Sequence, residues 1–500
     1  MVQSSKTIAK DTVTLPRKEY ENLQFKLAEY EQQIGWLKRM IFGRKSERFV
    51  PTDSAQITLD IEAPEQAVAQ PEKPKEHISY EREKPASKKN KAVRTPIPDH
   101  LPRQKETIEP ADIPEGSKKI GEEITEILEM APGKIYVRQI IRPKYGLPQD
   151  EGVVIGQLPS LPIPKGNAGP SLLAHILISK YTDHLPFYRQ RQQYKRMGVE
   201  LSESTIGGWF SASCQLLEPL YNRLRKRVLE ADYLQADETP IPVLTSQKPS
   251  ATHKGYHWVY HWPVEKLVMF DYRNSRSREG PAEILKDYKG ALQTDGYAAY
   301  DGFENKEGFQ LLACMAHARR KFIDAKANDS ERGENALAQI QQLYDIERQA
   351  REWKLNSDER KLVRQVEAAP LVKQLESWLK AQLSEVLPKS AIGQAIQYTL
   401  KLWPRLRRYI DDGRWEIDNN LIENTIRPVA LGRKNYLFAG SHEAAQRAAM
   451  VYSLLGTCKL NGTEPLAWLD DVFTRLPEHP VNRLDELLPP YWQPAVGQQV

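Results

Sequence analysis

Two short apolar segments that each end in an aspartate constrain the fold of this chain most strongly. The segments are Tyr233-Leu-Gln-Ala-Asp237 and Ala291-Leu-Gln-Thr-Asp295. Between them, runs of β-branched and aromatic residues at 256–261 and 267–272 predict two further strands, and a proline predicts the start of a helix over residues 281–288. The chain therefore carries an acidic side chain at the tips of two strands that a meander and a helix separate.

The order of the predicted elements brings these two acids together. A last strand is predicted at residues 311–313, and Cys314-Met-Ala-His317 opens the next helix. Three strands, a helix, two strands and a helix is the order of the ribonuclease-H-like α/β fold, in which the first and fourth strands are neighbours. Asp237 and Asp295 are therefore expected to lie close together. Adjacent carboxylates repel each other unless a divalent cation lies between them, and oxygen ligands favour Mg²⁺ or Mn²⁺ over zinc.

A third acid is expected further along the chain. The candidates are Glu416, Asp418 and Glu423. We expect Glu423, because Asp418 can act as the N-cap of a helix that brings Glu423 to the aspartates. The predicted buried face of that helix carries Leu421, Ile422 and Ile426, and a separate face carries Asn419, Glu423 and Arg427. The alternative is that Glu423 is a solvated surface residue.

The long spacer before Glu423 predicts a helical insertion over about residues 325–410, rich in Leu, Gln, Lys and Glu at helical periodicity. Such an insertion could cover the site or contact DNA. Basic residues cluster in this half of the chain, at Arg319, Arg320 and Lys321, at Arg405, Arg407 and Arg408, and at Arg427, Arg433 and Lys434. The aromatic residues among them, Trp403, Trp415, Tyr436 and Phe438, could stack on bases, although core packing is the commoner role.

The N-terminal part of the chain has a heptad pattern followed by a stretch without periodicity. The apolar seam consists of Tyr20, Leu23, Leu27, Tyr30, Ile34, Leu37 and Ile41. It predicts a short coiled coil and self-association, with packing on the same chain as the alternative. Residues 51–110 are rich in Pro, Glu, Lys and Gln, which favours a flexible linker.

Two small regions precede the first acid. Alternation around residues 120–145 predicts short strands of a β-rich module, which contains no cysteine for a zinc site. Helices are predicted at 170–181, at 185–197 and from Ser202 onward, with a break at Gly198. This pattern favours a helix-turn-helix, and a plain helical subdomain is at least as well supported.

Composition restricts the compartment and the partners. The first twenty residues contain no apolar run of signal-peptide length, and no segment approaches the length of a membrane span. Three scattered cysteines, Cys214, Cys314 and Cys458, do not form a disulfide framework, so a cytoplasmic protein is expected. The formal net charge of +5 indicates a nucleic-acid partner only where basic residues cluster.

Ordered motifs along nearly the whole chain resemble those of one family, the large transposase of the insertion-sequence-66 type, a DDE transposase. The motifs include Ile41-Phe-Gly-Arg-Lys-Ser-Glu47, Gly169-Pro-Ser-Leu-Leu-Ala-His175, Ala236-Asp237-Glu-Thr-Pro240, Gln293-Thr-Asp295-Gly-Tyr297, Cys314-Met-Ala-His317-Ala-Arg-Arg-Lys-Phe322, Asp418-Asn-Asn-Leu-Ile-Glu423-Asn-Thr-Ile-Arg427-Pro428 and Val451-Tyr-Ser-Leu-Leu-Gly-Thr-Cys458. A single motif of this kind would have little weight, but the ordered set is specific.

The resemblance implies a bacterial enzyme in which Asp237, Asp295 and Glu423 hold Mg²⁺ or Mn²⁺ and cut DNA at the ends of an insertion sequence before joining it to target DNA. If the partner is DNA, the basic clusters predict contacts from Arg319, Arg320, Lys321, Arg427, Arg433 and Lys434. Cys314 and His317 match a motif that we expect to be structural or to support DNA binding. We further expect a homo-oligomer that is associated with the nucleoid. Its possible partners include small accessory proteins of the element, and no membrane partner is expected.

The family pattern also divides the chain. The predicted parts are a coiled-coil helix (17–50), a flexible linker (51–110), a small β-rich module (111–165), a helical region with a possible helix-turn-helix (166–230), a ribonuclease-H-like catalytic core (231–440) and a C-terminal helical element (441–500). Many relatives carry a four-cysteine zinc module where residues 111–165 lie. This chain lacks those cysteines, so no zinc is expected. Two other functions use the same features: a non-catalytic protein that binds element ends, and a ribonuclease-H-like nuclease.

Overall fold

The computed structural model describes residues 97–111, 113–131, 133–147, 153–244 and 252–494. All of them belong to one of two compact units of the chain, the unit that spans residues 90–500. The predicted heptad seam and most of the predicted linker lie outside the described residues. Within the described residues, no helix is both long and apolar enough to cross a membrane.

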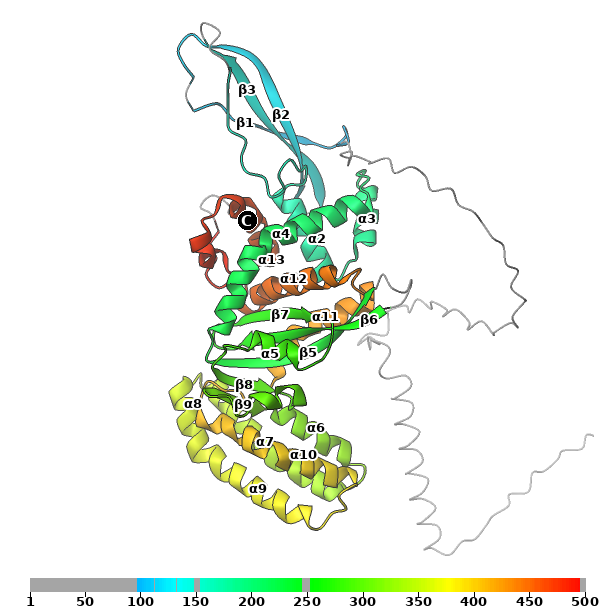
Figure 1. The fold of residues 1–500 in the computed structure, drawn as a ribbon, viewed down its shortest axis with the longest axis vertical. Coiled ribbons are helices and arrows are strands. Elements are labelled where there is room, and N and C mark those ends of the chain that lie inside the picture. The colour runs from blue at the N-terminus through cyan, green and yellow to red at the C-terminus, as the bar shows by residue number, and fades with distance from the viewer. Residues whose placement is uncertain (1–96, 112, 132, 148–152, 245–251, 495–500) are drawn as a thin grey trace, which may run out of the picture. The chain divides into compact units, whose positions relative to one another are not determined.

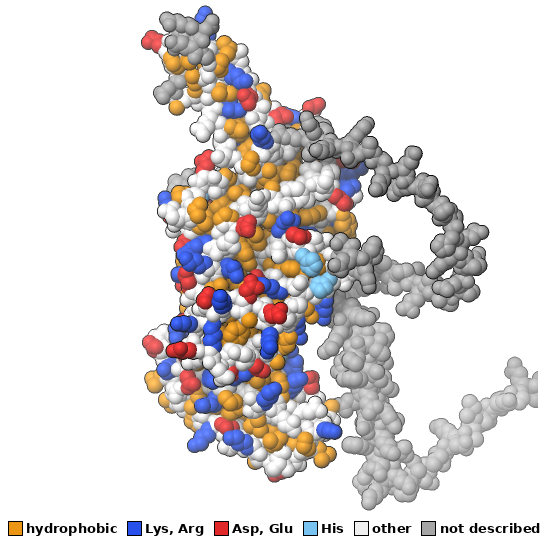
Figure 2. Space-filling view, in the orientation of Figure 1, with side chains coloured by type: hydrophobic (Ala, Val, Ile, Leu, Met, Phe, Trp, Pro, Cys, Tyr) orange, Lys and Arg blue, Asp and Glu red, His pale blue; other side chains and the backbone are white. Residues whose placement is uncertain are grey.

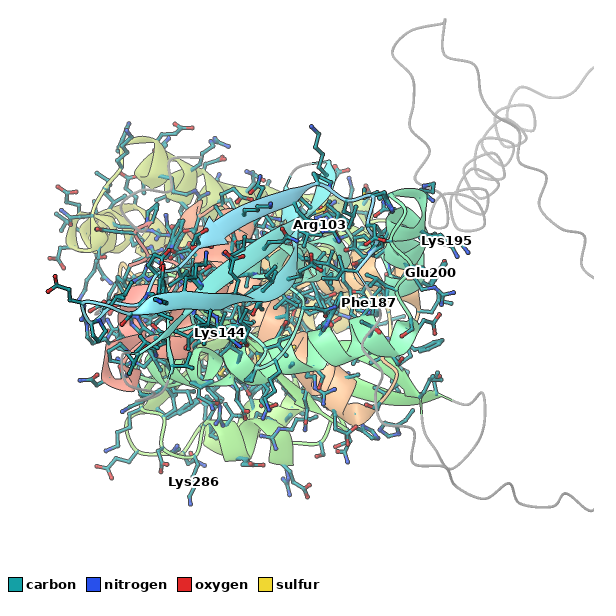
Figure 3. The ribbon with its side chains drawn as sticks, turned by 90° about the horizontal axis from the view of Figure 1, so that it is seen from above. Arg103, Lys144, Phe187, Lys195, Glu200 and Lys286 are labelled. Carbon is teal, nitrogen blue, oxygen red and sulfur yellow. The ribbon has the colours of Figure 1, made fainter. Side chains whose placement is uncertain are left out.

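A small sheet begins the described part of the chain. Its strands are β1 (Arg103–Thr107), β2 (Lys118–Ala131), β3 (Lys134–Gly146) and β4 (Val153–Ile155). β2 and β3 form a long antiparallel hairpin that turns at Gly133, where φ is +75°, while β1 runs parallel to β3. Figure 3 looks onto this sheet, with Arg103 on β1 and Lys144 on β3 labelled. β1 falls within the stretch predicted to be a linker, so the sheet begins earlier in the chain than expected.

Three helices follow, at the positions predicted from the sequence. They are α2 (Pro170–Tyr181), α3 (Phe187–Arg196) and α4 (Glu203–Leu229). Pro170 lies in the first turn of α2, and the Ser202 hydroxyl caps α4 by accepting a hydrogen bond from the Thr205 amide at 3.0 Å. α2 is almost entirely buried, because it packs between the hairpin and the C-terminal helix α13 (Pro465–Arg475). These helices therefore join the small sheet to the rest of the unit.

The central sheet has five strands in the order β7-β6-β5-β8-β9. They are β5 (Tyr233–Leu244), β6 (Thr252–Trp262), β7 (Leu267–Arg273), β8 (Gly290–Thr294) and β9 (Phe309–Ala313). β5, β6 and β7 are antiparallel, whereas β5, β8 and β9 are parallel. The prediction that the first and fourth strands of this region are neighbours is confirmed.

The helix between β7 and β8 is shorter than predicted. α5 spans Glu279–Ile284, and Leu285 is its C-cap. The chain then turns, with the Tyr288 amide bonded to the Leu285 carbonyl and the Tyr288 hydroxyl donating to Ala291 at 2.8 Å. The prediction that this helix reaches residue 288 was wrong, because Tyr288 lies in a turn from which its hydroxyl binds the backbone at the start of β8.

Helices cover both faces of the central sheet (Figure 1). The helices on the C-terminal side of β9 are α6 (Met315–Ala325), α7 (Ser330–Glu352), α8 (Ser357–Val363), η3 (Arg364–Ala368), α9 (Ala369–Leu383), α10 (Ala391–Leu406), η4 (Arg407–Asp411), α11 (Asn420–Tyr436), α12 (His442–Asn461), η5 (Leu476–Glu478) and η6 (Val481–Leu487). Alternate residues of β5 belong to different apolar clusters: Leu234 and Ala236 pack with α4 and α12, whereas Tyr233 packs with α6 to α10.

The predicted helical insertion is confirmed as helical. Its apolar core includes Phe322 of α6, Leu343 of α7 and Leu379 of α9, all buried. Trp403 and Trp415 are buried in the same cluster, so these two rings are core residues and are not available to stack on bases. Tyr436 is half-buried and Phe438 is exposed.

Candidate active site

The two predicted aspartates follow the point at which neighbouring parallel strands separate. β5 and β8 are paired through Gln235 and Gln293, which are the last partners in their register. Asp237 and Asp295 each come two residues later. Asp295 directly follows the end of β8, but Asp237 lies within β5, which continues to Leu244 because it stays paired with β6. The prediction that Asp237 ends its strand was therefore wrong. The crevice at the carboxyl ends of parallel strands that part is where α/β sheets commonly place ligands. The topology thus brings both acids to one edge of the sheet.

The side chain of Asn419 lies in the gap between the parting strands. Its amide nitrogen donates to the backbone carbonyl of Ala236 on β5 at 3.2 Å and to that of Gln293 on β8 at 3.4 Å. Asn419 is buried, so its side-chain amide is satisfied by the backbone of both strands. Asn419 is also the N-cap of α11, the helix that carries Glu423.

A buried glutamine pair ties the segment before α11 to the same two strands. The Gln235 amide donates to the Gln293 side-chain oxygen at 3.1 Å and to the Asp418 carbonyl at 2.9 Å. The Gln293 amide donates to the Glu416 carbonyl at 2.7 Å, and the Tyr233 hydroxyl donates to the Gln293 oxygen at 2.6 Å. The entry to α11 is therefore held by the strands that bear the aspartates.

The N-terminus of α11 differs in detail from the prediction. Asn419, and not Asp418, is its N-cap, while Asp418 accepts hydrogen bonds from the Asn420 amide at 3.0 Å and from the Tyr344 hydroxyl of α7 at 2.8 Å. Ile422 and Ile426 are buried as expected, but Leu421 is 43% exposed. The prediction that Leu421 faces the core was wrong, because Asn419 sets a different orientation for the first turn.

The three acids share one electrostatic neighbourhood. Burial raises the pKa of the Asp237 carboxyl to about 7, and the carboxylates of Glu238, Asp295 and Glu423 act in the same direction. The backbone amide of Glu238, 2.8 Å from Asp237 Oδ1, opposes this rise. Asp237, Asp295 and Glu423 are all partly exposed, so solvent and a substrate can reach them. The structure thus brings the three predicted acids into mutual influence.

The donor set has the chemistry of a divalent-cation site. A cation would relieve the repulsion among the carboxylates and favour the ionised form of Asp237. Among the described residues, no three His, Cys, Asp or Glu side chains already lie close enough to hold a metal ion. Mg²⁺ is commonly held by one or two carboxylates together with water and substrate phosphate oxygens, and does not require a closed set of protein ligands. The residues present therefore fit such an ion.

The residues Cys314 and His317 lie beside this cluster. Cys314 is buried at the N-cap of α6, and its sulfur accepts a hydrogen bond from the backbone N–H of Asn419 at 3.2 Å. Burial raises the pKa of the Cys314 thiol to about 12. His317 Nε2 lies 4.0 Å from Glu423 Oε1. Cys314 thus supports the backbone at the N-cap of α11, and His317 faces the third acid.

Comparison with known proteins places the chain in a family. Residues 165–447 match the family described as "Transposase IS66 family", which is more than half of the chain. The chain belongs to the IS66 transposase family. Residues 453–489 match its "IS66 C-terminal element", and residues 29–105 match "Transposase C of IS166 homeodomain". The resemblance expected from the motifs is therefore confirmed.

Curated relatives of similar length support this assignment to the IS66 family. The chain is 32% identical to "Uncharacterized protein y4jD" of Sinorhizobium fredii (strain NBRC 101917 / NGR234), over 96% of this chain and 97% of that protein. It is 33% identical to "Uncharacterized protein y4qI" of the same strain, over 92% of this chain and 88% of that protein. The chain is thus similar to these proteins along almost all of its length.

An acid that was not predicted as a site residue also lies in the candidate site. Glu238 directly follows Asp237, and its side chain is only 3% exposed. Arg276 Nε donates to Glu238 Oε1 at 2.7 Å, and the Arg276 guanidinium lies 4.0 Å from the centre of the Tyr297 ring. Strand alternation would have placed Glu238 on the face opposite Asp237. The pairing with Arg276 is tertiary, so no local signal in the sequence could have predicted it.

The insertion of this IS66-family chain contacts the turn that carries Asp295. The Tyr398 hydroxyl of α10 donates to the Asp295 backbone carbonyl at 2.9 Å. Gly296 has a φ of +91°, and a Cβ atom there would lie 2.7 Å from a methyl group of Leu402. The positive φ favours glycine at this position, and a larger residue would also have to displace the Leu402 side chain. The insertion therefore helps to shape the second acid's turn.

The six predicted DNA contacts have different environments. Arg427 and Lys434 are exposed on α11, whereas Arg433 is half-buried and donates to the Pro240 carbonyl. Lys321 lies 5.5 Å from the centre of the Tyr398 ring, next to the Asp295 turn. Arg319 and Arg320 line a separate groove.

The basic cluster of Arg405, Arg407 and Arg408 is not among these six residues. Two of its members are paired with an acid: Arg405 and Arg408 form ion pairs with Glu304, at 2.6 and 3.1 Å.

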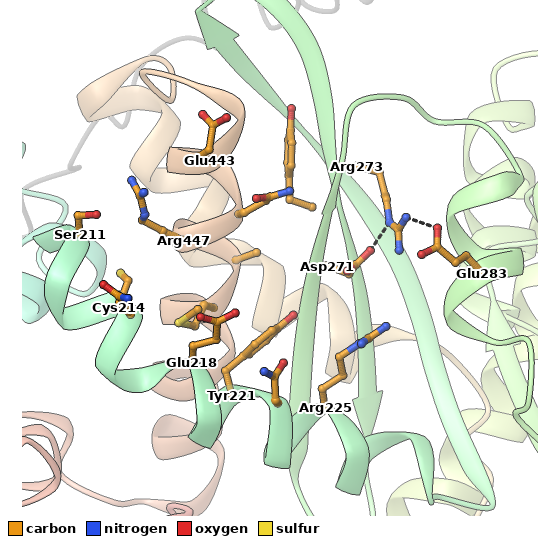
Figure 4. A pocket seen from close by; sticks show the side chains of 16 residues that line it. Ser211, Cys214, Glu218, Tyr221, Arg225, Asp271, Arg273, Glu283, Glu443 and Arg447 are labelled. Carbon is orange, nitrogen blue, oxygen red and sulfur yellow. Dashed lines mark hydrogen bonds and ion pairs between the residues drawn. The ribbon is translucent and has the colours of Figure 1, made fainter. Parts of the chain in front are cut away.

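A polar cavity of about 630 Å³ lies between α4, β7 and α12 (Figure 4). Its arginines and acids compensate one another: Arg273 contacts both Asp271 and Glu283 at 2.5 Å. None of the predicted site residues lines it. On the face in Figure 2, basic and acidic side chains are similarly interspersed. This cavity is therefore distinct from the acid cluster and has no predominance of one charge.

Proposed function

We propose that this chain is a DNA transposase that cuts DNA at the ends of a bacterial insertion sequence and transfers the strand into target DNA. The observation that carries the proposal is the attachment of α11, through Asn419, to both strands that bear the aspartates. This attachment keeps Glu423 near Asp237 and Asp295. In agreement, the carboxylates of Asp295 and Glu423 both contribute to the raised pKa of Asp237. The sheet order supports a ribonuclease-H-like catalytic core over residues 231–440.

In this mechanism Asp237, Asp295 and Glu423 would hold Mg²⁺ or Mn²⁺. The ions, when bound, would polarise the attacked phosphate and stabilise the charges of the attacking and leaving oxygens. Asn419 keeps the first turn of α11 in the gap between β5 and β8, and His317 faces Glu423. Tyr398 and the Asx-type bond from the Tyr297 amide to Asp295 Oδ1, at 2.8 Å, hold the Asp295 turn. These groups position the carboxylates for the reaction.

The proposal extends to the rest of the chain. The DNA-binding role falls to the helices of region 166–230 and to basic residues around the core, while the heptad near the N-terminus mediates self-association. A cytoplasmic, nucleoid-associated homo-oligomer without structural zinc follows from this reading. Cys314 and His317 supply only two ligands, which cannot close a tetrahedral zinc site on their own.

A strand-cleavage assay tests the proposal. Purified full-length protein with Mg²⁺ and DNA that carries the terminal sequences flanking its gene should nick and join strands. Asp295→Asn should lose cleavage by at least about a hundredfold and keep DNA affinity, because it removes a proposed metal ligand. Asp324→Asn, which neutralises an exposed acid on α6, is the matched control and should cut as the wild type does.

Three outcomes would contradict the proposal in different ways. Full activity of Asp295→Asn would show that Asp295 is not a metal ligand. Cleavage of any duplex or hybrid without preference for paired terminal repeats would favour a nuclease. Binding to the repeats without cleavage at any Mg²⁺ or Mn²⁺ concentration would favour a non-catalytic DNA-binding protein.

A further inference from the structure

A groove lined by arginines lies next to the acid cluster. It has a volume of about 410 Å³ and runs between α6 and α7. Arg319 and Arg320 reach it from α6, and Arg348 and Arg351 reach it from α7 of the helical insertion. We call this the α6–α7 groove. Two of its four arginines thus come from a part of the chain that the sequence motifs do not include.

The charge of the α6–α7 groove is of one sign. None of its lining residues is acidic. Arg348 lies 3.0 Å from Asp345 and 3.9 Å from Glu352, but Arg319, Arg320 and Arg351 take part in no ion pair among the described residues. The guanidinium groups of these three arginines repel one another, and an anion bound among them would relieve this repulsion. Planar guanidinium groups match the geometry of phosphate oxygens.

The groove adjoins the proposed catalytic residues. Asn420, at its floor, is the first residue of α11 and lies one helical turn before Glu423. Tyr344 also lines the groove, and its hydroxyl donates to Asp418. On α6, His317 faces Glu423 while Arg319 and Arg320 face the groove. A DNA strand that enters the acid cluster would therefore have phosphates within reach of these arginines.

We propose that the α6–α7 groove binds the phosphodiester backbone of the DNA strand that is cut, next to the cleaved phosphate. This rests on the proposed function as a transposase. The groove contacts phosphates and not bases, so its contribution to affinity is independent of sequence and decreases with salt. Its role is to fix the position of the strand relative to Asp237, Asp295 and Glu423.

The double variant Arg348→Gln/Arg351→Gln tests the groove without altering α6 or α11. Fluorescence anisotropy with a labelled duplex should show that the variant binds DNA at least about tenfold more weakly than the wild type near 0.15 M salt. The slope of log affinity against log salt should decrease in magnitude by about 1.8, because each phosphate contact contributes about 0.9. Lys373→Gln/Lys389→Gln removes two exposed charges from the same insertion, outside the groove and outside the predicted basic clusters, and should keep the wild-type slope.

Phosphate-ethylation interference locates the contacts. The phosphates at which ethylation weakens wild-type binding, but no longer affects Arg348→Gln/Arg351→Gln, should lie within about one turn of duplex from the cleavage position. Thermal melting confirms that each variant is folded. If the double variant kept both the wild-type slope and the wild-type interference pattern, the groove proposal would be wrong. Cleavage by the wild-type protein would in that case still support the proposal of a transposase. Wild-type protein that neither binds nor cuts DNA would overturn both.

Discussion

Gln235 and Gln293 occupy opposite positions at the last paired residues of β5 and β8, and the amide nitrogen of Gln235 lies 3.1 Å from the side-chain oxygen of Gln293. Each glutamine precedes one of the aspartates by two residues and also binds a backbone carbonyl of the segment that leads into α11. A displacement of either strand would therefore be transmitted to the helix that carries Glu423. This buried pair links the positions of all three acids.

Gln293→Leu should impair the proposed metal site more than the fold. The substitution removes the acceptor for Tyr233 and Gln235 and the donor to Glu416, which should cost about 1–3 kcal/mol in the free energy of unfolding. Because the entry to α11 loses an attachment, cleavage should decrease by about 10- to 100-fold, and half-maximal cleavage should need more Mg²⁺. The measurement is a Mg²⁺ titration of cleavage beside urea denaturation. Gln397→Leu, at an exposed site on α10, is the control. An unchanged Mg²⁺ requirement would refute the positioning role.

Arg364→Met should destabilise the helical insertion strongly. The Arg364 side chain is fully buried, pairs with Glu347 at 2.7 Å and donates to the backbone carbonyls of Tyr409, Asp412 and Trp415. Its removal takes one donor from each of those carbonyls and leaves Glu347 with only Arg360 as a partner, so a loss of about 3 kcal/mol or more is expected by urea denaturation. Arg407→Met, at an exposed position, should change the stability by less than about 0.5 kcal/mol. A comparable small change for Arg364→Met would contradict the structural role.

Asp470→Asn should flatten the dependence of stability on pH. Burial raises the pKa of Asp470 to about 6, with Glu129 and Asp471 acting in the same direction and Arg138 opposing them. Below the unfolded-state pKa, near 3.8, both states are protonated and no penalty exists. As the pH rises from about 4 to about 6, the unfolded state ionises first and stability falls. The variant lacks this fall and should be more stable by about 1–3 kcal/mol at pH 7 to 8 in urea denaturation. The control Asp324→Asn should keep the wild-type dependence of stability on pH. If Asp470→Asn also kept it, the raised pKa assigned to Asp470 would be wrong.

Deletion of residues 17–42 should abolish or weaken self-association. The seam from Tyr20 to Ile41 repeats at heptad spacing, and a single apolar stripe needs a partner to be buried. Light scattering should give a lower molar mass for this deletion than for the full chain. A deletion of the same length at residues 55–80 controls for chain length and should leave the oligomer intact. An unchanged mass after the first deletion would refute the coiled coil.

Local patterns predicted the strands of the central sheet and the acid that follows β8, because alternation and turn residues act over a few positions. They placed the end of β5 too early, because the pairing of β5 with β6 continues past Asp237 to Leu244. The adjacency of β5 and β8 followed from element order. The structure departs from the prediction where a contact outside a helix determines where that helix begins or ends. Asn419 displaces Asp418 as N-cap because its amide bridges two strands, and Tyr288 ends α5 early because it fastens β8. The Glu238–Arg276 pair and the α6–α7 groove join residues far apart in sequence, so no window of residues contains their signal.

The packing of the insertion limits how members of this family can vary. α7 and α10 touch the acid-bearing segments through Tyr344 and Tyr398, and α6 and α7 share a buried core. Insertions or deletions within these helices would rotate Tyr344 or Tyr398 away from its partner by fractions of a turn. The connection between α9 and α10, residues 384–390, contains neither tyrosine, so a change of its length should disturb these contacts less. The helical insertion and the sheet therefore position the acid-bearing segments jointly.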